Sequence, residues 1–141
     1  KPYLYQINGP AMRIVYKISA YLIVLLGIVH IALAPFFYQR FGLEVLWFAG
    51  TGLALVFLGN MNLIVLMSQR SAFYMMVITS NLMAILLMVL ILTMAPAPQA
   101  YIALALAVVL MVSSVSEYIR LVRALVAKEK AAREQQEEGA S

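Results

Sequence analysis

The chain contains no cysteine, a single histidine and few charged residues, which make up 11% of its 141 positions. Without cysteine it can form no disulfide bond, thiolate metal site or cysteine nucleophile. Its one histidine, His30, cannot alone supply a three-histidine metal site or a pair of haem ligands. Sequence motifs for nucleotide, haem or zinc chemistry are also missing. We therefore expect no catalytic residue, no metal and no cofactor, and the sequence favours a protein that is not an enzyme.

Hydrophobic residues, by contrast, make up 65% of the chain and gather in four long stretches. The stretches cover residues 12–34, 45–67, 73–94 and 101–121. A helix needs about 20 apolar residues to cross the hydrocarbon core of a membrane. The first stretch lacks the small-residue cleavage site of a signal peptide, so we expect it to be a permanent span. The sequence predicts an all-α fold, an integral membrane bundle of four transmembrane helices.

Proline and glycine suggest where these helices begin and end. Gly9-Pro10 is expected to break the chain just before the first helix, and Pro35 to end that helix. The fourth helix has no such stop, and its pattern runs on into a charged stretch with i,i+4 pairs of opposite sign. We predict two parts, a four-span bundle over 1–126 and a charged cytoplasmic helical tail over 127–141.

The ten basic residues are distributed unevenly between the two sides of the predicted bundle. Only Arg40 falls in an outer connection, and the other nine lie on the opposite side. The positive-inside rule then places both termini in the cytoplasm. We interpret the chain as a protein of a bacterial cytoplasmic (inner) membrane. Because the basic residues flank the spans, anionic lipid headgroups are the expected partner, and nucleic acid is not.

Small residues recur at helical spacing and indicate faces that pack closely. They occur in three of the stretches, as Ala20, Gly27 and Ala34, as Gly52 and Gly59, and as Ala103 and Ala107. Packing between helices of one bundle is the favoured interpretation. The alternative is an interface in a homo-oligomer or a larger membrane complex.

Several polar and aromatic residues are expected near the outer ends of the helices. His30 lies three residues after Gly27 on the close-packing face, and Glu44 and Thr51 share one stripe of the second helix. In one interpretation these groups are structural, with a neutral His30 bonded to Glu44, Thr51 or Tyr101 and an Arg40–Glu44 ion pair. In another they form a pocket for a polar headgroup or a proton, and metal or haem ligation by His30 is a third possibility. The candidate outer pocket comprises His30, Arg40, Glu44, Trp47, Thr51 and Tyr101.

A second polar level lies in the inner half of the predicted bundle. Three helices place amides or hydroxyls at similar depth, namely Asn60, Asn62, Ser80, Asn81, Ser113 and Ser114. We expect interhelical hydrogen bonds here, in particular from Asn60 or Asn62 to the third or fourth helix. A water-filled vestibule or substrate site is the alternative. Tyr16 is assigned to the aromatic belt at the inner interface rather than to this cluster.

Three classes of function are compatible with these features. The first is a small, non-enzymatic membrane protein that binds a lipid-like ligand or serves as an accessory subunit. The second is a small oligomeric transporter or channel. The third is a membrane enzyme or quinone-linked redox protein with a pocket around His30, Arg40 and Glu44. The lack of catalytic groups favours the first class.

Tags at either end of the chain are expected to be accessible only from the cytoplasmic face, because nine of the ten basic residues lie on that side. Labelling of the tags in sealed inside-out and right-side-out vesicles measures this accessibility. Protease cleavage within residues 128–138 from the outer face would contradict the predicted topology.

Overall fold

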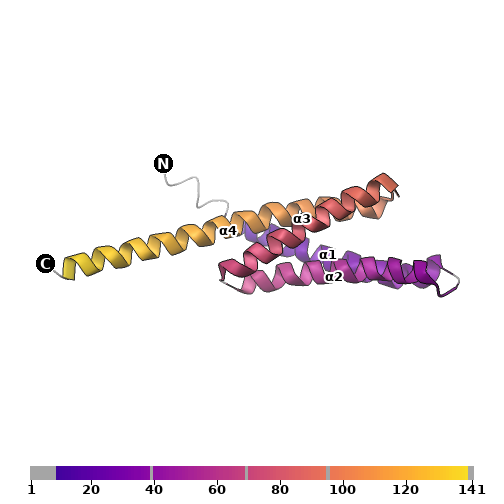
Figure 1. Cartoon of the computed structure of the whole chain (residues 1–141), viewed down its shortest axis with the longest axis horizontal. Helices are drawn as coiled ribbons and strands as arrows, with labels where there is room; N and C mark the ends of the chain where they lie inside the picture. The colour runs from indigo at the N-terminus through magenta and orange to yellow at the C-terminus, as the bar shows by residue number, and fades with distance from the viewer. Residues whose placement is uncertain (1–8, 39, 69, 95, 140–141) are drawn as a thin grey trace.

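The computed structural model describes residues 9–38, 40–68, 70–94 and 96–139, which form four helices and, over these ranges, no strand (Figure 1). The helices are α1 (Gly9–Phe37), α2 (Leu43–Met67), α3 (Ser71–Met94) and α4 (Pro98–Gly139). Each is long and apolar enough to cross a membrane. The predicted all-helical fold with four such helices is therefore confirmed.

The two prolines of α1 lie inside the helix, one at each end. α1 begins at Gly9, so Gly9-Pro10 opens the helix rather than preceding it, and because α1 continues through Pro35 to Phe37 the predicted end at Pro35 is wrong. Pro10 is tolerated because the first N–H groups of a helix have no partner within it. Pro35 lies in the last turn, where its missing N–H costs a single intrahelical bond. The Tyr38 N–H donates to the Ala34 carbonyl at 3.2 Å and closes the helix beyond it.

The four helices pair as two antiparallel hairpins. α1 packs most extensively on α2, and α3 on α4, while contact between α1 and α4 joins the hairpins. Of the three pairs of sequential helices, α2 and α3 have the least contact. The connections of both hairpins lie at the same end of the molecule, at the right of Figure 1, and we call this the hairpin end. The α2–α3 connection lies at the opposite end, which we call the terminal end. The two hairpins diverge towards the hairpin end (Figure 1).

The α1–α2 hairpin is held close by its small residues. A Cβ atom built on Gly27 would lie 2.5 Å from the Gly52 carbonyl oxygen, and one on Gly59 would lie 2.8 Å from that of Ala20. Such backbone contact is possible only without intervening side chains. In α4, Ala103 and Ala107 are likewise buried. These small residues thus pack between helices of one chain, as the favoured interpretation expected.

The outward surface of the bundle is apolar on all four helices. Only 17–33% of the residues in each apolar window are buried inside the bundle. Large side chains such as Phe57, Leu90 and Ile102 are more than half exposed. In water, an exposed apolar surface of this extent would promote association, whereas hydrocarbon surroundings accommodate it.

The last part of α4 extends beyond the other three helices, at the left of Figure 1. Residues 123–137 are all exposed. Arg133 donates to Glu129 at 2.6 Å, and Lys130 lies 3.8 Å from Glu134. These are two of the i,i+4 pairs that the sequence suggested, and they stabilise a solvated helix modestly.

The substitution Gly52→Ala is expected to lower the free energy of unfolding by about 1–3 kcal/mol. The new Cβ would lie 2.8 Å from the Gly27 carbonyl oxygen, a backbone atom that cannot move aside. Gly50→Ala is the matched control, since nothing lies within 4 Å of its Cβ position. That control is expected to be neutral or stabilising, because alanine is the better helix former. Unfolding in detergent by heat or denaturant measures both variants, and equal losses would contradict the account.

Candidate functional site

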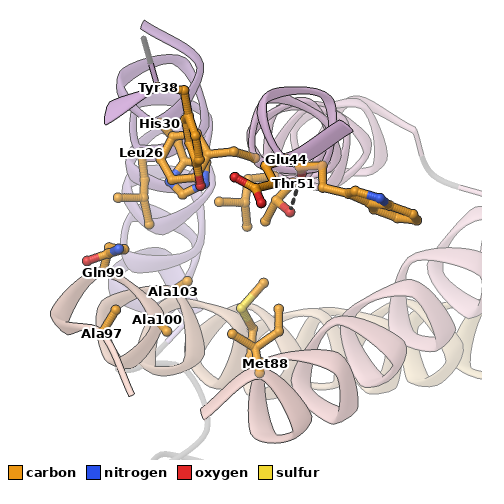
Figure 2. Close-up of a pocket in the computed structure, with 14 residues that line it drawn as sticks. Leu26, His30, Tyr38, Glu44, Thr51, Met88, Ala97, Gln99, Ala100 and Ala103 are labelled. Carbon is orange, nitrogen blue, oxygen red and sulfur yellow. Dashed lines mark hydrogen bonds between the residues drawn. The ribbon is translucent and has the colours of Figure 1, made fainter. Parts of the chain in front are cut away.

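A pocket of about 470 Å³ opens between the two hairpins at the hairpin end (Figure 2). We call it the hairpin-end pocket. One wall comes from the α1–α2 hairpin and consists of Leu26, His30, Tyr38, Glu44, Trp47, Phe48, Thr51 and Leu55. The facing wall comes from the α3–α4 hairpin and consists of Met88, Ile91, Ala97, Gln99, Ala100 and Ala103. The divergence of the hairpins therefore creates the pocket.

The polar groups of this pocket lie mainly on the α1–α2 side. The imidazole of His30 stacks on the Phe48 ring, with centroids 3.8 Å apart and an interplanar angle of 19°. The Tyr38 ring meets the same phenyl group at 62°. The Glu44 carboxylate and the Thr51 hydroxyl lie near each other in the same wall (Figure 2). The Thr51 hydroxyl donates to the Trp47 carbonyl at 3.0 Å and can still accept a hydrogen bond.

The inner part of the pocket is apolar. Leu55, Met88 and Ala103, from three different helices, are each at most 5% exposed and line its inner part. The pocket thus presents hydrogen-bonding groups near the hairpin end and hydrocarbon further in. A cavity with such a polar-to-apolar gradient matches an amphipathic molecule.

Four of the six residues predicted for the outer pocket line it, namely His30, Glu44, Trp47 and Thr51. Arg40 does not line it and forms no ion pair with Glu44. Arg40 lies outside α2, which begins at Leu43, so the i,i+4 geometry of a helix does not apply. Tyr101 is 56% exposed and is absent from the lining, because it projects from a different face of α4 than Ala100 and Ala103 do.

The structural interpretation of His30 also needs correction. Among the described residues, the imidazole makes no hydrogen bond, and its contact is the stacking on Phe48. The expected bonds to Glu44, Thr51 or Tyr101 are therefore not formed. The ring nitrogens remain available to a bound molecule.

The inner polar level forms a buried cluster of four side chains, one from each helix. Asn62 and Asn81 exchange two amide hydrogen bonds, of 2.9 and 3.0 Å. Tyr16 donates to the Asn62 side-chain oxygen at 2.9 Å, and Asn81 donates to Ser114 at 3.3 Å. Both asparagines are 0% exposed. We call Tyr16, Asn62, Asn81 and Ser114 the central amide cluster.

The expected interhelical bond is thus present, and Asn62 rather than Asn60 makes it, to Asn81 of α3. Asn60 is exposed, because it lies 200° around α2 from Asn62. Ser80 donates within its own helix to the Met76 carbonyl. Ser113 is buried and contacts the sulfur of Met12 at 3.8 Å.

Tyr16 is the residue that the sequence reasoning missed. It is fully buried rather than part of an interfacial belt. Its position one helical turn before Ala20 places it on the small-residue face of α1. That spacing was the available signal for an inward-facing tyrosine.

Over the described ranges, no group of three or more His, Cys, Asp or Glu side chains could hold a metal ion. Every buried side-chain nitrogen and oxygen atom there has a hydrogen-bond partner. The sequence matches no protein-family model, and comparison with curated proteins and with solved structures found no similar protein.

The substitution Asn62→Leu is expected to cost about 1–3 kcal/mol of stability, because it leaves buried partners in Tyr16 and Asn81 unsatisfied. Asn60→Leu is the matched control, an amide two residues away on the exposed side of α2. It is expected to be neutral or stabilising. Thermal unfolding in detergent compares the two, and a larger loss in the control would show that the cluster is not a structural centre.

Proposed function

We propose that the chain is an integral membrane protein of a cytoplasmic membrane, with both termini on the cytoplasmic side. Four helices of sufficient length and an apolar surface on every helix support insertion. The distribution of basic residues supports the orientation, since eight of the nine that the structure describes lie towards the terminal end or in the α4 extension. The hairpin-end pocket would then open near the outer surface of the membrane.

We further propose that the protein is a non-enzymatic binder of a lipid-like, amphipathic ligand. The hairpin-end pocket carries this proposal, because polar groups at its mouth lead to an apolar interior. An acyl or isoprenoid tail would lie beside Leu55, Met88 and Ala103 and make apolar contacts with their side chains. A head group would lie beside Glu44 and His30.

The lining residues also indicate the chemistry of that head group. The Glu44 carboxylate is an acceptor, and the one basic residue of the first connection, Arg40, does not line the pocket. A head group that donates hydrogen bonds, such as a hydroxyl or an amine, therefore fits better than a phosphate. The stacked rings of His30 and Phe48 add an aromatic surface against which such a group can pack.

The structure favours binding over conduction or catalysis. Buried Leu58 and Leu110 and the residues of the central amide cluster lie further along the bundle, and none of them lines the pocket. In the pocket itself, His30 and Glu44 are not hydrogen-bonded to each other. Neither residue is therefore oriented by the other as the members of a catalytic dyad are.

Glu44→Gln and His30→Ala are each expected to weaken retention of the bound amphiphile roughly tenfold, the effect of losing a hydrogen bond to a charged or polar group. Native mass spectrometry of the chain extracted from its membrane in mild detergent measures retained lipid per protein. Arg40→Gln is the control, since Arg40 lies nearby in sequence but outside the pocket.

The control is expected to retain ligand as the unsubstituted protein does. Loss of ligand in Arg40→Gln alone would contradict the proposed site. Lower thermal stability in the pocket variants with unchanged ligand retention would show that His30 and Glu44 stabilise the fold and do not hold a ligand.

A further inference from the structure

A second hollow, of about 730 Å³, lies at the terminal end of the bundle. It is bounded by α1, α2 and α4, and it shares no lining residue with the hairpin-end pocket. Three of its lining residues are cations, and we call it the basic groove. Its cationic residues are Arg13, Lys17 and Arg120.

The cations of α1 lie on one face of that helix. Arg13, Lys17 and Tyr21 are spaced by four residues, so their side chains follow one another along the groove. Arg13 donates to the Leu66 carbonyl at 2.9 Å, in the last turn of α2. This bond satisfies a terminal carbonyl of α2 and fixes the guanidinium at the edge of the groove. A guanidinium has five N–H donors, so it can bind a second acceptor at the same time.

The charge of the basic groove is only partly balanced by the protein. Arg120 donates to Glu117 at 2.7 Å, and Glu117 is largely buried. Lys17 forms no ion pair with any described residue. Lys17 therefore brings a positive charge that no described carboxylate pairs with, and the groove attracts an anion.

The rest of the groove is apolar. Ile14, Leu63, Leu66 and Met67 form its walls, and Met67, the last residue of α2, is 88% exposed. A nucleic acid or an acidic peptide would leave these walls without apolar contacts. A molecule with a negative head and a hydrocarbon tail satisfies both parts of the groove.

We propose that the basic groove binds one anionic phospholipid, with its phosphate between Arg13 and Lys17 and an acyl chain along Ile14 and Leu63. Arginine and lysine next to a membrane-level apolar surface are suited to such headgroups. This inference rests on the membrane insertion proposed above, but not on the ligand of the hairpin-end pocket. The two sites would differ in charge, one acidic and one basic, and so in the lipids they select.

The test uses the full chain in phosphatidylcholine vesicles to which spin-labelled phosphatidylglycerol is added, with the immobilised fraction of the label as the readout. Lys17→Gln and Arg13→Gln are each expected to weaken retention about fivefold. The control removes two charges elsewhere, with Lys128→Gln and Lys130→Gln on the exposed extension of α4. This control is expected to retain the lipid within about twofold, since the two removed charges lie beyond the groove.

Lys17→Arg keeps the charge and is expected to retain binding, which separates a lipid contact from a general loss of fold. If Arg13→Gln fails to fold because the Leu66 carbonyl loses its donor, Lys17→Gln alone decides the outcome. Equal retention in Lys17→Gln and the unsubstituted chain would overturn the inference, and so would an equal loss in the control. Displacement of the label by inorganic phosphate would also overturn it, because a free anion would then suffice. Failure of the protein to float with the vesicles, with or without the added phosphatidylglycerol, would contradict membrane insertion itself.

Discussion

The reciprocal hydrogen bonds between Asn62 and Asn81 are the interaction on which the rest of the bundle depends. They connect α2 to α3, the pair of sequential helices with the least contact otherwise. Tyr16 and Ser114 extend the same network to α1 and α4. Two fully buried amides in apolar surroundings are costly unless every donor and acceptor is paired. One axial register of the four helices brings these four side chains together, so the cluster fixes that register.

The hollows at the two ends of the bundle are arranged around this central cluster. Close backbone contact at Gly27 and Gly52 keeps the α1–α2 hairpin tight up to the hairpin end, while the α3–α4 hairpin diverges from it (Figure 1). The resulting pocket has Glu44 at its mouth, and at the other end Arg13 and its neighbours form a basic groove. The central amide cluster lies along the bundle between these two ends, and the two hollows share no lining residue. In our proposals, each holds a different kind of amphiphile.

The sequence predicted those features that depend on length or on equal depth along helices. Four apolar stretches of membrane-spanning length gave four helices, and the matching depths of Asn62 and Asn81 gave their hydrogen bond. The facing wall of the pocket was not predicted, because apolar side chains surround most of α3 and hydrophobicity alone does not mark Met88 as inward-facing. The available signal was that Met88 lies seven residues after Asn81, on the same face of the helix. The depth of a residue along its helix also does not tell in which direction around the helix axis its side chain points. For that reason Tyr101 was assigned to the pocket although it faces away, and Tyr16 was assigned to the interface although it is buried.

The single tryptophan of the chain, Trp47, lines the hairpin-end pocket and offers the most direct test of the central claim. Amphiphiles with brominated tails and hydroxyl or amine head groups quench tryptophan fluorescence on contact. If the pocket binds such a molecule, quenching of Trp47 in detergent micelles saturates at one amphiphile per chain and requires Glu44. Quenching that rises with the bulk concentration of the brominated amphiphile, without saturation and equally in Glu44→Gln, would show that the pocket holds only unselected hydrocarbon and would contradict the account.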